Sequence, residues 1–176
     1  MKARPLIVLF ALSLTLMFLG TGCGKSSSRA EVQKRLDLVR TASNPAYLEK
    51  AALEDESPVV RQAATERLFD QKLIERIVIH DKDFGVRLAA LKRVRSQAVV
   101  GQVATGDKSR YVRIAAAGIL NDQRILTEVA RTDRDRIVRM TAIGGITSRA
   151  VIEQVADSDK DPQVRAAAEK RLASLR

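Results

Sequence analysis

One short motif recurs along the chain at a constant spacing of 26 residues, and this repetition limits the fold more than any other feature of the sequence. The motif reads SPVVRQAA, DFGVRLAA, SRYVRIAA, DRIVRMTA and DPQVRAAA, beginning at Ser57, Asp83, Ser109, Asp135 and Asp161. It divides the chain into five units, which are residues 45–70, 71–96, 97–122, 123–148 and 149–174. A fixed period of this size is typical of a solenoid, in which each unit packs only against its neighbours.

Two columns of the aligned units contain only Ser, Asp or Asn, the residues that cap the N-termini of helices. Pro45, Pro58 and Pro162 directly follow such residues, and proline is well tolerated at the first position of a helix. Each unit is therefore predicted to form two short helices. The ten cap residues are Asn44, Asp70, Ser96, Asp122 and Ser148 for the first helices, and Ser57, Asp83, Ser109, Asp135 and Asp161 for the second helices.

Apolar residues recur within each unit at helical spacing. In the first unit they include Leu48 and Ala51 in the first helix, and Val60, Ala64 and Leu68 in the second helix; the other units have apolar residues in the same columns. Spacings of three and four residues place each set on one face of a helix. No alternating strand pattern competes, so the predicted fold class is all-α.

The repeat resembles the HEAT repeat superfamily, in particular the short bacterial HEAT-like repeats related to those of phycobilin lyases. The resemblance rests on the pattern VR-x-AA with an Asp six residues before the Arg, and it covers residues 45–174. It implies a right-handed α-solenoid of helical hairpins, a HEAT-like superhelix, with an Asp–Arg ladder of hydrogen bonds along the turns between helices. The implied ladder pairs are Asp55 with Arg61, Asp81 with Arg87, Asp107 with Arg113, Asp133 with Arg139, and Asp159 with Arg165.

The regularly spaced arginines allow a second interpretation, because guanidinium groups bridge phosphates well and a row of them could bind a polyanion along the inner face. Each Arg, however, has an Asp in its own unit. A ladder that neutralises its own charge favours hydrogen bonding inside the stack. The sequence therefore predicts a structural role for this column.

Both ends of the repeat array carry features of caps. Residues 30–43 contain Val32, Leu36 and Val39 at helical spacing, which predicts one amphipathic helix that covers the first unit. In the last unit, Glu169 takes the column that holds Ala117 in the third unit, and a polar residue is expected where no neighbour follows. The expected architecture is five 26-residue repeats over 45–174 plus an N-terminal half-repeat cap.

Residues 1–22 are predicted to be a lipoprotein signal peptide. Lys2 and Arg4 precede an apolar stretch at 6–19, which as a helix would rise only about 21 Å and is too short for a hydrocarbon core of about 30 Å. This arrangement is typical of an export signal. The small residues before Cys23 resemble the lipobox of bacterial lipoproteins, although Gly20 stands where Leu is commonest. The resemblance implies cleavage before Cys23, lipidation of its sulfur, and a flexible linker over 23–29.

Other interpretations of the same segment are an ordinary secretion signal and a retained anchor. A phosphate-binding loop fits poorly, because Gly24-Lys25-Ser26 would need a glycine at position 19, where the chain has Leu19. Such a loop also lies between a strand and a helix, and no strand is predicted.

Nothing in the sequence indicates catalysis. Cys23 is the only cysteine and His80 the only histidine, so we expect no catalytic residue, no cofactor, no metal site and no enzymatic activity, with His80 exposed or capping a helix. Tyr47 and Phe69 lie in or beside core columns, so no aromatic platform for nucleic-acid bases is predicted. A HEAT-like lyase and a nucleic-acid binder rank as the lower alternatives.

The chain is basic, with a formal charge of +10 that becomes +8 when residues 1–22, including Lys2 and Arg4, are removed. A basic surface suits anionic partners. The preferred hypothesis is a lipid-anchored, non-enzymatic scaffold or assembly factor of the bacterial cell envelope that binds an unidentified protein partner. The alternative is a basic solenoid that binds anionic envelope lipid or polymer. Gly24, rather than Asp, after the cysteine resembles the lipoproteins that enterobacteria send to the outer membrane, and this resemblance implies the periplasmic face of the outer membrane rather than the inner membrane.

Overall fold

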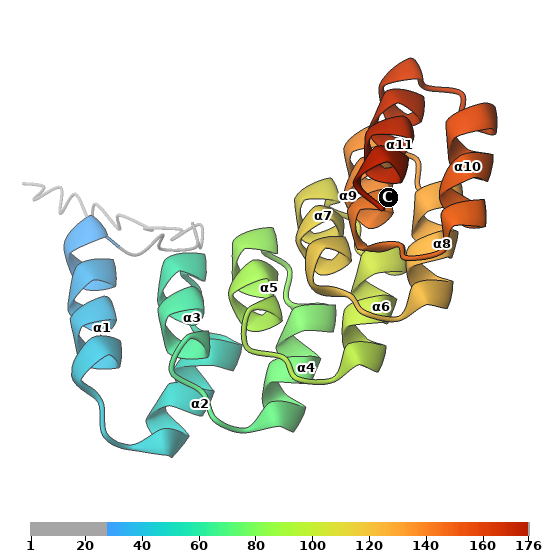
Figure 1. The fold of residues 1–176 in the computed structure, drawn as a ribbon. Helices are drawn as coiled ribbons and strands as arrows, with labels where there is room; N and C mark the ends of the chain where they lie inside the picture. The colour runs from blue at the N-terminus through green and yellow to red at the C-terminus, as the bar shows by residue number, and fades with distance from the viewer. Residues whose placement is uncertain (1–27, 176) are drawn as a thin grey trace, which may run out of the picture.

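The computed structural model describes residues 28–175, and within them the chain is all-helical (Figure 1). The first helix is α1 (Arg29–Thr41), and each unit then adds one helix to an outer row and one to an inner row. The outer helices are α2 (Pro45–Glu54), α4 (Gln71–His80), α6 (Gln97–Gly106), α8 (Gln123–Thr132) and α10 (Arg149–Ser158). The inner helices are α3 (Pro58–Thr65), α5 (Phe84–Leu91), α7 (Arg110–Ile119), α9 (Arg136–Gly145) and α11 (Pro162–Ser174).

The two rows pack differently. Each outer helix packs mainly on the inner helix of its own unit, whereas the inner helices also pack closely on one another, from α1 on α3 through to α9 on α11. The outer helices lie further apart, so the stack curves, and Figure 1 shows the inner row along the concave side. The predicted α-solenoid is confirmed.

All ten predicted cap residues occupy the N-cap position of a helix. The Asn and Asp side chains, and that of Ser96, accept hydrogen bonds from backbone N–H groups of the first turn. These bonds satisfy donors that the helix itself leaves unpaired. Ser57, Ser109 and Ser148 make no such side-chain bond.

One hydrophobic core runs the length of the array. Leu36 and Ala168 mark its two ends, and every unit between them contributes buried residues from both of its helices. One alanine column of the inner helices is completely buried: Ala64, Ala90, Ala116, Ala142 and Ala168. Because the first described helix begins at Arg29, a chain that begins at residue 23 contains every described helix.

The expectation that Phe69 lies in or beside the core is wrong. Leu68 fills the core position and is 2% exposed, while Phe69, the next residue in the turn after α3, is 86% exposed. Successive side chains in a turn point in different directions. The ring of Phe69 is therefore exposed, although the next residue back in the sequence, Leu68, is buried. Tyr47, by contrast, packs against the core.

No helix among residues 28–175 combines the length and the apolar character that crossing a bilayer requires. Residues 1–27, including the expected signal peptide and Cys23, lie outside the described part of the chain.

Candidate interaction surface

The Arg–Asp ladder connects neighbouring units, which differs from the pairing expected within each unit. Arg113 on α7 donates from Nε and Nη2 to the carboxylate of Asp133, at 2.7 and 3.1 Å, while its Nη1 donates to the backbone carbonyl of Asp107 at 2.8 Å. The same arrangement links Arg61 to Asp81, Arg87 to Asp107, and Arg139 to Asp159. Each guanidinium therefore joins the turn of its own unit to the turn of the next.

The direction of the pairing follows from where the aspartates stand. Each one is the C-cap of an outer helix, and its carboxylate also accepts the backbone N–H two residues later, as Asp133 does from Asp135 at 2.8 Å. This bond fixes the turn and holds the carboxylate against the preceding unit. A bidentate Arg–carboxylate pair then adds both strength and a defined orientation. The ladder thus sets the register between units.

The two ends of the ladder differ. Arg35 on α1, which the sequence pattern did not identify, donates to the carboxylate of Asp55 at 2.9 and 3.2 Å. At the other end of the described residues, Arg165 donates to the carbonyl of Asp159 at 2.8 Å. The four arginines between these ends are buried, being only 2–3% exposed: Arg61, Arg87, Arg113 and Arg139.

Ionisation states in the ladder follow from this pairing. Hydrogen bonding to Asp133 raises the pKa of Arg113, and hydrogen bonding to Asp159 raises the pKa of Arg139. Burial alone would raise the pKa of the Asp159 carboxyl, but the hydrogen bonds from Arg139 and from the backbone N–H of Asp161 outweigh it and hold that pKa below its usual value. The Arg139–Asp159 pair is therefore charged on both sides, and its two buried charges are matched.

A second series of contacts between units involves glutamine and was not foreseen. Gln97, the first residue of α6, accepts the backbone N–H of Asn121 at 2.9 Å, and its amide group donates to the carbonyl of Ile119 at 3.5 Å. Gln71 and Gln123 make the corresponding bonds to the next units. The recurrence of Gln at the first position of three units was the signal that could have revealed this series. These bonds hold the edge of the array opposite to the ladder.

Large apolar side chains are exposed on the concave side, on four consecutive inner helices. We call this surface the inner apolar strip, and it consists of the exposed Val59, Phe84, Tyr111 and Ile137 with the partly buried Leu88, Ile114 and Met140. The rings of Phe84 and Tyr111 lie 6.0 Å apart, and the guanidinium of Arg110 lies 5.0 Å from the centre of the Tyr111 ring. The strip therefore crosses from one unit to the next.

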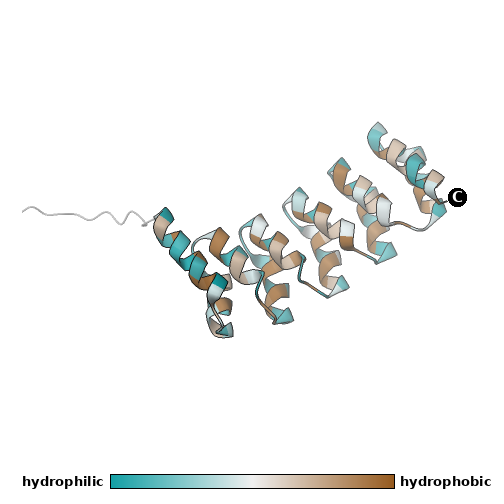
Figure 2. Ribbon diagram, turned by 60° about the vertical axis from the view of Figure 1, so that its left-hand side comes forward, coloured by the Kyte–Doolittle hydropathy of each residue, from teal (hydrophilic) through white to brown (hydrophobic). Residues whose placement is uncertain are grey.

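The strip has polar limits. Gln62 on α3 and Glu66 directly after it are exposed in the first unit, and Gln163 and Lys170 on α11 are exposed in the last. Figure 2 shows apolar stretches recurring along the array, whereas the visible face of α1 is mainly hydrophilic. An apolar surface with polar margins is the usual arrangement of a protein-binding site.

The remaining predicted residues lie elsewhere. His80 is the exposed last residue of α4. In the described part of the chain, no three His, Cys, Asp or Glu side chains are grouped so that they could hold a metal ion. Cys23 is among the residues that the structure does not describe, so its lipidation stays a prediction.

Comparison with known proteins gives no match to any family model, curated protein or solved structure.

Proposed function

We propose that this protein is a non-enzymatic, lipid-anchored scaffold or assembly factor of the bacterial cell envelope that binds another protein through the inner apolar strip. The observation that carries the proposal is the exposure of Phe84, Tyr111 and Ile137, which are 49%, 54% and 40% exposed on three successive inner helices. Exposed apolar area of this kind is costly in water and gains free energy when a partner covers it.

The surroundings of the strip indicate the chemistry of the partner. Arg110 and Arg136 stand at the first positions of α7 and α9, and Lys92 is exposed near the end of α5. A segment with apolar side chains next to acidic ones would match both the strip and these cations. The buried ladder arginines take no part, because their donors already bond to Asp side chains and backbone carbonyls.

Site-specific photo-crosslinking in cells tests the proposal. A photoreactive residue placed at Tyr111 or Ile137 should give one discrete adduct, and the same residue at Gln102 or Glu128, which are exposed on the outer helices α6 and α8, should not. The double variant Tyr111→Ser/Ile137→Ser should abolish the adduct formed from a photoreactive residue at Phe84. Adducts of equal yield on both faces, or none from the inner positions, would rule out the strip as the binding surface.

A further inference from the structure

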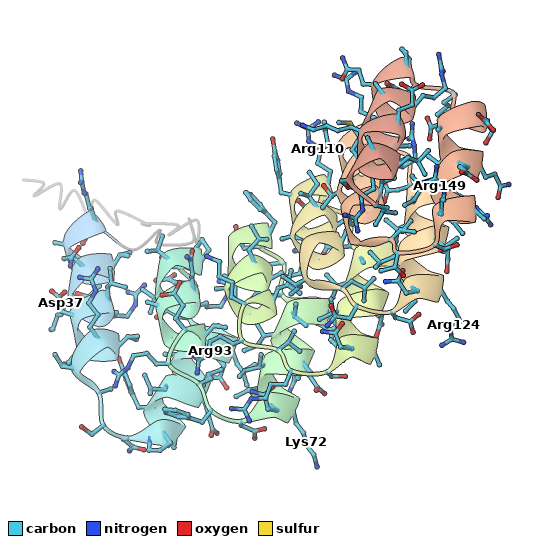
Figure 3. All side chains as sticks on the ribbon, in the orientation of Figure 1. Asp37, Lys72, Arg93, Arg110, Arg124 and Arg149 are labelled. Carbon is cyan, nitrogen blue, oxygen red and sulfur yellow. The ribbon has the colours of Figure 1, made fainter. Side chains whose placement is uncertain are left out.

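The edge of the array that carries the turns between outer and inner helices is rich in exposed cations. We call it the turn edge. It presents Lys82, Lys108, Arg134 and Lys160 at the same position of four successive turns, together with Arg110 and Arg136. Figure 3 shows Arg110 on this side of the molecule and Lys72 and Arg124 at the opposite edge.

The cations of the turn edge are not balanced by the acidic residues around them. In the last four turns, the four ladder aspartates are bonded to the four buried arginines. This leaves three carboxylates, those of Asp83, Asp135 and Asp161, against the six exposed cations. All three also accept backbone N–H groups as helix caps. Two of them pair with cations of this edge, Asp135 with Arg110 at 3.5 Å and Asp161 with Arg136 at 3.9 Å, so the four cations in the turns themselves have no carboxylate partner among these three. The turn edge therefore keeps an excess of positive charge.

Clefts open between successive turns along this edge. One of about 420 Å³ lies between the third and fourth turns and is lined by the exposed Lys108 and Arg134, and also by three ladder residues that are already paired: Asp107, Arg113 and Asp133. A second of about 420 Å³ lies between the fourth and fifth turns and is lined by Arg134, Arg136 and Lys160, with Asp161 and the buried Arg139 beside them. Both are open to solvent at the surface, and both bring two or more cations around a space that a phosphate group could enter.

The course of the first helix places the chain's N-terminal side at this same edge. Arg35 reaches Asp55 in the next turn just as Arg61 reaches Asp81, so α1 is oriented like the inner helices, which all begin at the turn edge. Figure 1 agrees, because α1 and the later inner helices start on the same side of the array. Cys23 precedes Ser28 by five residues, a length of chain that spans at most about 18 Å.

We propose that the turn edge docks on the anionic phospholipid surface in which the anchor is inserted, with head-group phosphates entering the clefts between turns. For its orientation this inference rests on the lipid anchor of the proposed function, since a short tether from Cys23 keeps the turn edge close to the bilayer. Basic residues near an anionic leaflet each add to the attraction, within a Debye length of the surface. The solenoid then stands edge-on, and the inner apolar strip faces sideways and stays open to its partner.

Vesicle flotation tests the docking separately from the anchor. The protein is residues 23–176 with Cys23→Ser, which cannot be acylated at that position and keeps every described helix. It should float with vesicles containing 30% phosphatidylglycerol in phosphatidylcholine, but not with pure phosphatidylcholine, and 0.5 M NaCl should release it. The variant Lys82→Glu/Lys108→Glu/Lys160→Glu should partition about tenfold less or weaker still. The matched control Lys72→Glu/Lys92→Glu/Lys170→Glu changes three exposed lysines away from the turn edge and should lose much less.

Several outcomes would overturn the docking surface. They are no flotation of the unchanged protein with anionic vesicles, equal losses in the two triple variants, or binding to duplex DNA with the same dependence on the three turn lysines but none to vesicles. If circular dichroism shows that the triple Glu variant does not fold, the triple Gln variant Lys82→Gln/Lys108→Gln/Lys160→Gln is used to test whether the three turn lysines are needed for flotation. Because acylation at Cys23 is read by mass spectrometry, failure of the anchor and failure of the docking surface remain distinguishable.

Discussion

A buried arginine in this protein stabilises two units at once, since it bonds a backbone carbonyl in its own unit and a carboxylate in the next. The side chains of Arg113 and Asp133 are only 3% and 5% exposed. Removing one member of such a pair leaves the other buried without its counter-charge, and this costs more than the pair contributes when intact. The ladder residues are therefore sensitive positions for stability.

Arg113→Ala should lower the free energy of unfolding by about 3–5 kcal/mol, because the carboxylate of Asp133 stays buried without its partner. Urea denaturation of residues 23–176 measures the change. Arg165→Ala is the matched control: Arg165 bonds only the carbonyl of Asp159 in this ladder, so its loss leaves no carboxylate unpaired. If both variants lose the same free energy of unfolding, the bond from arginine to the aspartate of the next unit adds no stability beyond the bond within the unit.

The lowered pKa of Asp159 predicts acid sensitivity. A carboxyl whose pKa is lower in the folded state stabilises the protein fully above its unfolded-state pKa of about 3.9, and this contribution is lost as the pH falls through the folded-state value. Stability should therefore hold near neutral pH and decrease below about pH 4. Asp159→Asn should be less stable at pH 7 and should show a shallower decrease, as measured by urea midpoints at pH 7, 4 and 3. Asp157→Asn, at an exposed site on α10, should leave the profile unchanged.

The helices are short and gain their stability from packing rather than from length. Inner helices α3 and α5 have eight residues and α7 and α9 have ten, which is too short for a stable isolated helix. Each depends on packing against the outer helix of its own unit and against the neighbouring inner helices. One alanine of each inner helix is completely buried in this packing, so side-chain volume at that column is restricted.

Ala116→Leu should destabilise the array by about 1–3 kcal/mol, because a larger side chain does not fit between closely packed helices. Ala116 is completely buried on α7. Lys170→Leu adds a leucine at an exposed position of α11 and should change the urea midpoint little. Similar midpoints for the two variants would contradict the assignment of the alanine column to the core.

The helices could be predicted from the sequence because their signals are local. A cap residue, a following proline and apolar spacings of three and four all act within one helix, and the structure confirms all ten caps. The partner of each ladder arginine could not be predicted from the sequence. Asp107 and Asp133 belong to the same repeat column, and each lies at a constant distance in sequence from Arg113, so the pattern fits either partner equally well. Only the placement of one unit against the next decides between them. Phe69 was misplaced for a similar reason, since its direction depends on the geometry of a turn.

At the scale of the whole molecule, the proposed anchor and the solenoid are separate parts whose tests are independent. The pattern before Cys23 predicts lipidation from a motif alone, and no described residue bears on it. The inner apolar strip and the turn edge, by contrast, emerge only when residues 26 apart are brought side by side. The excess of cations on the turn edge was not evident until the ladder pairs were known, because only those pairs show which aspartates are already bonded.

Cys23→Ser should abolish lipid attachment in cells and leave the uncleaved precursor, because the cysteine thiol is the acyl acceptor in the lipoproteins that residues 20–23 resemble. Mass spectrometry of the purified chains measures both changes. The expected result is an acylated chain beginning at Cys23 for the unchanged protein and an unmodified chain beginning at Met1 for the variant. Finding the same unlipidated mature chain in both would refute the anchor.

The ladder has a direction, since each unit donates an arginine to the following unit and receives one from the preceding unit, with Arg35 serving the first and Arg165 left at the last. Whole units can therefore be duplicated or deleted in the middle of the gene and still leave every internal ladder pair matched. A change by any other number of residues would break the pairing. The lengths of the turn edge and of the concave surface can thus be changed, by evolution or by protein engineering, in steps of one repeat without redesigning the contacts between repeats.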